Sequence, residues 1–126
     1  MLLVDTSVWI DYLRSGDPLL AELLDQSVVA SHDFVIGEIA CSNLKNRQEV
    51  LSLLALLPQC AQVTHEEVLS FIERHQLIGR GIGYVDACLL AAATLSRMQL
   101  LDTGQAAGRH RRSDRMRVRA KNDATP

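Results

Sequence analysis

The sequence has no long apolar run, few aromatic residues and no basic segment ahead of its first apolar residues. Of its 126 residues, 48% are apolar, 22% are charged and 4% are aromatic. Its longest apolar stretches, 53–57 and 87–93, fall well short of the ~18 residues that a membrane-spanning helix needs. Asp5 closes the short apolar run at the N-terminus, so we expect no signal peptide. The apolar content and a net charge of −2 also exclude disorder for most of the chain.

Cysteine is scarce as well. The three cysteines, Cys41, Cys60 and Cys88, are odd in number, lie among apolar neighbours and show no C-x-x-C spacing. Such a pattern argues against a disulfide framework and against a zinc site. We therefore expect three buried free thiols, in a protein of the reducing cytoplasm.

The small net charge conceals an uneven distribution. Residues 1–108 carry six Lys/Arg against thirteen Asp/Glu, whereas residues 109–126 carry seven against two. An acidic body with a basic tail suggests a cation-dependent site in the body and a polyanion near the tail. We expect one domain over 1–108. The tail over 109–126 is either an edge strand, because apolar residues alternate with arginines over 115–120, or a disordered, solvated segment.

Short apolar runs alternate with segments of helical periodicity. The runs at 1–4, 28–30, 60–63 and 99–101 are typical of buried parallel strands. Helices are predicted through residue 14 after the capping residues 5–7, and over 19–26, 33–44, 47–57, 64–77 and 84–97. This alternation predicts an α/β fold of three layers, with a central parallel sheet of four to five short strands and helices on both faces. Trp9, at helical spacing, is expected in the core.

Four acidic residues are candidates for a site at the carboxyl ends of the strands, where such a fold binds ligands. Asp5 and Asp102 directly follow the first and last of these strands. Asp86 is the third residue of a predicted helix after a glycine-rich loop, and Glu38 lies near the second turn of another. Glu38 interrupts an apolar run, where an unpaired carboxylate is costly to bury. Oxygen ligands of this kind favour Mg²⁺ or Mn²⁺ over zinc. The alternative is that Asp5 and Asp86 are only helix-capping acids, favoured by the helix dipole.

Three segments in this order resemble the acidic motifs of the PIN domain, and most of all the VapC toxins of type II toxin–antitoxin pairs. They are 2–11 (LLVDTSVWID), 35–40 (VIGEIA) and 81–87 (GIGYVDA), and the resemblance covers about residues 1–104. It implies the PIN fold and a Mg²⁺-dependent endoribonuclease in which Mn²⁺ can substitute. It also implies a homodimer that a VapB-type antitoxin keeps inactive, with RNA as the substrate and no membrane association.

The resemblance also assigns roles to residues. Asp5, Glu38 and Asp86 match the family's three main acids, and Asp102 matches the fourth. Ser7 and Thr6 match hydroxyl positions that help to place water or metal. Two other interpretations stay open: a PIN nuclease that acts on DNA or in RNA processing, and a degenerate PIN domain that only binds RNA or protein.

Basic residues must meet the phosphate backbone of any RNA substrate. The candidates are Lys45, Arg47, Arg80, Arg109, Arg111 and Arg112. The apolar faces of 19–24 and 51–57 look larger than a small core needs, so they either cover the sheet or form surfaces for a second copy or an antitoxin helix.

Overall fold

A short sheet forms the centre of the computed structural model, which describes residues 1–102 and 117–119. Its strands lie in the order β2-β1-β3-β4. They are β1 (Leu2–Val4), β2 (Val29–Ala30), β3 (Gln99–Asp102) and β4 (Arg117–Arg119). β1 pairs in parallel with both β2 and β3, and β4 pairs antiparallel with β3. Parallel strands place their carboxyl ends at one edge of a sheet, which is where ligands bind in α/β folds.

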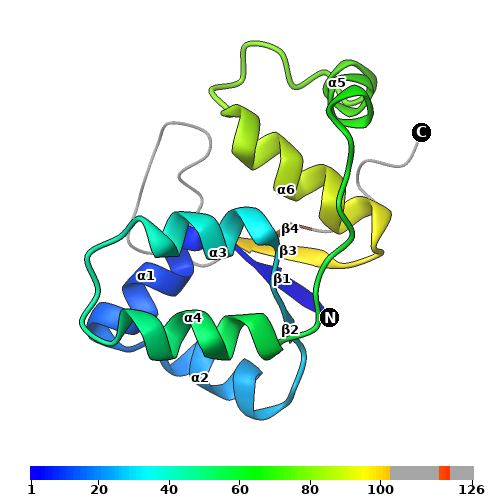
Figure 1. Cartoon of the computed structure of the whole chain (residues 1–126). Coiled ribbons are helices and arrows are strands. Elements are labelled where there is room, and N and C mark those ends of the chain that lie inside the picture. The colour runs from blue at the N-terminus through cyan, green and yellow to red at the C-terminus, as the bar shows by residue number, and fades with distance from the viewer. Residues whose placement is uncertain (103–116, 120–126) are drawn as a thin grey trace.

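Six helices pack around this sheet in the described part of the chain. They are α1 (Thr6–Ser15), α2 (Pro18–Asp25), α3 (Asp33–Ala40), α4 (Arg47–Leu56), α5 (His65–Arg74) and α6 (Tyr84–Leu95). Figure 1 shows α5 and α6 on the upper side of the strands, and α2 and α4 below them. The predicted α/β architecture, with helices on both sides of a sheet, is confirmed. Three of the four described strands are parallel, whereas β4 adds to the edge in the antiparallel sense, so fewer strands are parallel than the four to five predicted.

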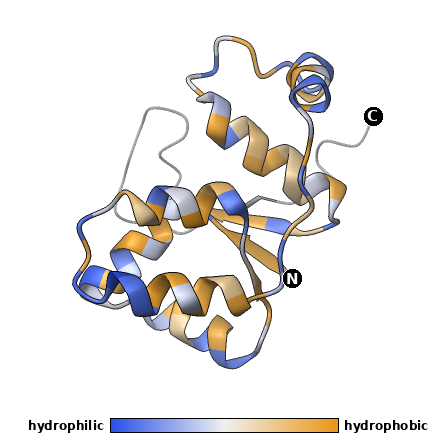
Figure 2. Ribbon diagram, viewed as in Figure 1, coloured by the Kyte–Doolittle hydropathy of each residue, from blue (hydrophilic) through white to orange (hydrophobic). Residues whose placement is uncertain are grey.

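The core lies between the strands and the apolar helix faces. Leu3, Val4 and Leu101 are fully buried, and Trp9 is 4% exposed, as its helical spacing predicts. Figure 2 shows β1, most of β3 and most of α6 in the colours of apolar residues, and the first turn of α4 in blue. The alanines of α6, including Ala92 and Ala93, are buried because their small side chains let the helix pack closely.

Side-chain caps fix where several helices begin. Asp17 accepts hydrogen bonds from the first amides of α2, and Pro18 supplies the first helical φ angle. Thr64 and Glu67 form a complete capping box at the start of α5. α1 ends at Gly16, whose φ of 82° favours glycine. These signals are local, which is why the sequence predicts these helix ends well.

The predicted strand over 60–63 is wrong. The segment forms an isolated parallel bridge between Gln59 and Ser31 and then leaves the sheet. The Cys60 amide still donates to the Ser31 carbonyl, but the Ala61 amide donates to the Ser96 hydroxyl at 2.9 Å. The hydroxyl of Ser96, the C-cap of α6, thus accepts the hydrogen bond that a neighbouring strand would otherwise have accepted.

Two further predictions fail at the end of α3. One is a helix that reaches residue 44, and the other is that all three thiols are buried. The helix ends at Ala40, because the Ser42 hydroxyl donates to the Ile39 carbonyl and Arg47 Nε donates to the Ala40 carbonyl. These side chains satisfy carbonyls that another turn would have used. Cys41 is therefore a C-cap residue and is exposed, whereas Cys60 and Cys88 are buried and free as predicted.

Most of the predicted basic tail, 109–126, lies outside the described residues. The exception is 117–119, which forms the edge strand β4, one of the two alternatives for the tail. The division into a domain over 1–108 and a tail stays a prediction. Among the described helices, none has the length and apolar character to cross a membrane.

Candidate active site

Asp5 and Asp102 lie side by side where β1 and β3 end. Val4 is in register with Leu101, and the Asp5 amide donates to the Leu101 carbonyl at 2.9 Å. The next residue on each strand is therefore an aspartate at the carboxyl edge of the sheet. Asp102 is 5% exposed, and Asp5 is half-buried.

Hydroxyl groups from the first turn of α1 hold two of the predicted carboxylates. Asp5 is the N-cap of this helix, and its Oδ2 accepts from Ser7 Oγ at 2.8 Å and from the Ser7 amide at 3.4 Å. Thr6 Oγ1 donates to Glu38 Oε1 at 2.5 Å, which ties α1 to α3. Asp5 and Glu38 are separated by 33 positions in the sequence, yet neighbouring residues of α1 orient both carboxylates.

Asp86 lies in the first turn of α6, after the loop that contains Gly79, Gly81 and Gly83. The residues just before it, Tyr84 and Val85, line a hollow together with Glu38 of α3. The start of α6 and the acidic face of α3 thus border the same space. The structure therefore brings the segments that carry Asp5, Glu38, Asp86 and Asp102 to one edge of the sheet.

The carboxylates do not converge on one point as the side chains stand. Within the described residues, no three Asp, Glu, His or Cys side chains form a group that could hold a metal ion. Glu38 is exposed, and hydroxyls hold it and Asp5 by hydrogen bonds to a charged group, each worth about 1.5–3 kcal/mol. A ligand that turns these carboxylates toward one point must offset that cost. All four donors are carboxylates, the ligands that hard divalent cations prefer, so the residues fit such an ion by their chemistry.

Comparisons with known proteins decide the family. Residues 2–107 match the model of the PIN domain. The chain is 50% identical over 95 residues to proteins named Ribonuclease VapC32 from two strains of Mycobacterium tuberculosis. The aligned part covers 75% of this chain and 77% of each relative. The chain belongs to the PIN-domain family and to its VapC branch.

A solved structure supports the same fold for this VapC-family chain. The crystal structure of FitAcB from Neisseria gonorrhoeae superposes on it with a TM-score of 0.59. The superposition covers 87% of this chain and 95% of the other, at 17% sequence identity. Identity this low shows a shared fold and nothing about the site.

The candidate RNA-binding residues of this PIN domain fall into two groups. Lys45, Arg47 and Arg80 are exposed on loops or helix starts, where a polyanion can reach them. Arg47 also uses its Nε to donate to the end of α3. The other three, Arg109, Arg111 and Arg112, lie outside the described residues.

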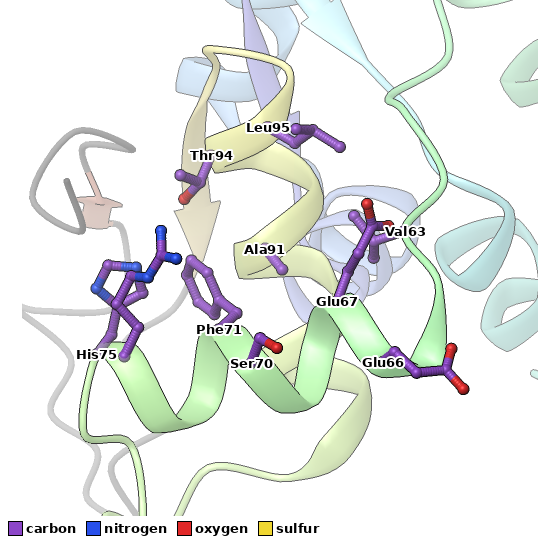
Figure 3. Close-up of a pocket in the computed structure, with 10 residues that line it drawn as sticks. Val63, Glu66, Glu67, Ser70, Phe71, His75, Ala91, Thr94 and Leu95 are labelled. Carbon is purple, nitrogen blue, oxygen red and sulfur yellow. The ribbon is translucent and has the colours of Figure 1, made fainter. Parts of the chain in front are cut away.

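A different hollow separates α5 from α6. It has a volume of about 420 Å³, and Figure 3 shows its lining residues on α5, on α6 and on the segment that precedes α5. Phe71 and Ala91 form part of its apolar wall, and Glu66, Glu67 and Arg74 supply charges. None of the four predicted acids lines it, so it is separate from the candidate site.

Sequence reasoning missed how histidines hold two exposed aromatic rings near the acids. The ring of His32 packs edge-on against Phe34, with 5.1 Å between ring centroids. His65 Nδ1 lies 2.7 Å from the Tyr84 hydroxyl. The pairing of Tyr84 with His65 links positions 19 residues apart and has no local signal in the sequence.

Proposed function

We propose that this VapC-family protein is a Mg²⁺-dependent endoribonuclease and the toxin of a type II toxin–antitoxin pair. The observation that carries the proposal is the edge of the sheet where Thr6 and Ser7 donate hydrogen bonds to Glu38 and Asp5, and where Asp5 follows the strand that pairs with the one carrying Asp102. Half of the aligned residues are identical to proteins named as ribonucleases, which supports the same activity here.

Asp5, Glu38 and Asp86 would hold the cation, and Asp102 would support it. A bound Mg²⁺ lowers the pKa of its water ligand and stabilises the charge that develops on the phosphoryl oxygens. Mn²⁺ has similar ligand preferences and is expected to replace it. Because carboxylates of equal charge repel one another, a cation between them also removes that repulsion.

The hydroxyls of α1 act as positioning groups. Each occupies one oxygen of its carboxylate, Oδ2 of Asp5 or Oε1 of Glu38, and leaves the second oxygen available for a ligand. The oxygen of a water molecule forms the new bond to phosphorus, and the bond from phosphorus to the 3′ oxygen breaks. The products carry 5′-phosphate and 3′-hydroxyl ends. The ribose 2′-hydroxyl has no part in this reaction, so selectivity for RNA depends on binding.

Binding needs basic and apolar surfaces away from the acids. Lys45, Arg47 and Arg80 would contact RNA phosphates from their exposed positions. On α2 and α4, Leu19 is 41% exposed and Leu56 is 81% exposed, although neighbouring leucines are buried. These apolar surfaces suit an antitoxin helix or a second copy of the chain.

Cleavage of total bacterial RNA by the purified, partner-free protein tests the proposal. New 5′ ends would be mapped by sequencing after incubation with Mg²⁺, with EDTA, and with a Glu38→Gln variant. We expect discrete cuts only with Mg²⁺ and intact Glu38. A parallel incubation with single-stranded and double-stranded DNA covers the DNA-directed alternative, which cuts in DNA but not in RNA would favour. Binding of RNA without any cut, in folded protein, would favour the degenerate binding module.

A further inference from the structure

A mainly apolar hollow borders the candidate site between α3 and the start of α6. Its volume is about 410 Å³. Phe34, Gly37 and Glu38 line it from α3, and Tyr84 and Val85 line it from α6. Because Glu38 belongs both to this hollow and to the acidic edge, whatever fills the hollow lies next to the groups that would hold the cation.

Two exposed aromatic rings form part of its wall. Phe34 is 40% exposed and Tyr84 is 44% exposed, so part of each ring is open to a ligand. A histidine contacts each of these two rings. The Phe34 amide donates to His32 Nδ1 at 3.0 Å while the two rings pack edge-on. The Tyr84 hydroxyl lies 2.7 Å from His65 Nδ1, with the rings tilted against each other.

The charge of the hollow excludes a phosphate as its occupant. Among the residues that the structure describes, its charged lining consists of Asp33 and Glu38, both acidic. A phosphate group would be repelled there. An uncharged planar group with hydrogen-bond donors fits both the rings and the carboxylates.

We infer that this hollow receives an unpaired nucleobase of the RNA substrate, next to the phosphate that is cut. The base stacks on Phe34 or Tyr84, and Asp33 accepts a hydrogen bond from its exocyclic amino group. Adenine, cytosine and guanine carry such a group, and uracil does not. The inference rests on the proposed function, and it names Phe34, Tyr84 and Asp33 as residues that determine specificity.

Stacking of a base on an aromatic side chain sets the expected size of the effect. Removing one such ring lowers affinity between about fivefold and about 150-fold. The loss should fall on one nucleotide beside the cut, because Glu38 is the site carboxylate that lines the hollow among the described residues.

The test uses RNA oligonucleotides with a randomised segment, incubated with Mg²⁺ and sequenced at the new ends. For the wild-type chain we expect uracil to be disfavoured at one position beside the cut. Asp33→Ala should lose that preference, because the hydrogen-bond acceptor is gone. Phe34→Leu and Tyr84→Leu should each cut more slowly, because stacking is lost. Phe34→Tyr should keep the wild-type rate, because the ring remains. Phe71→Leu is the matched control, since Phe71 lines the separate hollow between α5 and α6.

The outcomes distinguish a failure of this inference from a failure of the proposed nuclease function. If the wild-type chain cuts RNA, folded Phe34→Leu and Tyr84→Leu proteins keep its rate and folded Asp33→Ala protein keeps its preference, the inference is wrong and the nuclease stands. If these variants instead lose binding to a protein partner while cutting RNA normally, the hollow belongs to that partner and the inference is again wrong. A folded wild-type chain that cuts no RNA overturns both.

Discussion

Replacing Asp5 by asparagine separates two roles of one carboxylate. Asp5 caps α1 by accepting from the Ser7 amide and hydroxyl, and it stands at the edge where we place the cation. Asparagine caps helices about as well as aspartate does, so the variant keeps the cap and loses the charge. Alanine loses both.

The two variants should lose different amounts of folding stability. Asp5→Asn removes a negative charge at a helix N-terminus, which costs about 0.3–1 kcal/mol. Asp5→Ala additionally loses the cap, a further loss of about 1 kcal/mol, or ~4 °C in Tm for a domain of this size. The rate of RNA cleavage should depend on the negative charge of Asp5, which both variants lose. Losing even about 3 kcal/mol of transition-state stabilisation slows the reaction by about 150-fold in both variants.

Thermal unfolding and RNA cleavage would be measured on the same preparations. Asp17→Asn is the matched control, because Asp17 caps α2 in the same way. We expect Asp17→Asn to cut RNA at the wild-type rate and Asp5→Asn to lose cleavage while remaining folded. Wild-type cleavage by Asp5→Asn would refute the assignment of Asp5 to the site.

Three further predictions concern stability. In urea titrations, Leu54→Ala should lower the free energy of unfolding by about 2–5 kcal/mol, since Leu54 is 2% exposed. Leu53→Ala, at a 64% exposed position on the same helix, should change it by less than about 0.5 kcal/mol. Burial lowers the pKa of His32 below the ordinary 6.5, against an opposing effect of Asp33. The unfolded chain therefore binds the proton first, stability falls as pH drops below about 6.5, and His32→Asn should flatten that decline between about pH 7.5 and about pH 5.5. Thr64→Ala should cost about 1 kcal/mol by removing the cap on α5, and Thr64→Ser should restore most of it in thermal melts.

The parts of the fold that could be predicted from sequence are those with local causes. The apolar run before Asp5 and the hydroxyls after it specify a strand, a cap and a helix within a few residues. The apolar runs before Asp5 and Asp102 were enough to place both residues at the ends of strands, and the structure pairs these two strands in parallel. Capping residues such as Asp17 and Thr64 have the same local character.

The failures have non-local causes. The segment after Pro58 has the pattern of a strand, but the Ala61 amide donates its hydrogen bond to the Ser96 hydroxyl, 35 positions away. The end of α3 depends on Arg47, which reaches back seven residues. Likewise, the support of Tyr84 by His65 exists only once α5 and α6 have packed together. No periodicity or spacing in the sequence carries this information.

Titration of the purified protein with Mn²⁺, followed by calorimetry or by the Mn²⁺ resonance signal, tests the central claim most directly. The wild-type chain should show saturable binding. Asp5→Asn, Glu38→Gln and Asp86→Asn should each weaken it by at least about tenfold, while Asp17→Asn should leave it unchanged. Equal affinity in the wild-type chain and all three site variants would contradict the assignment of these carboxylates to a cation site.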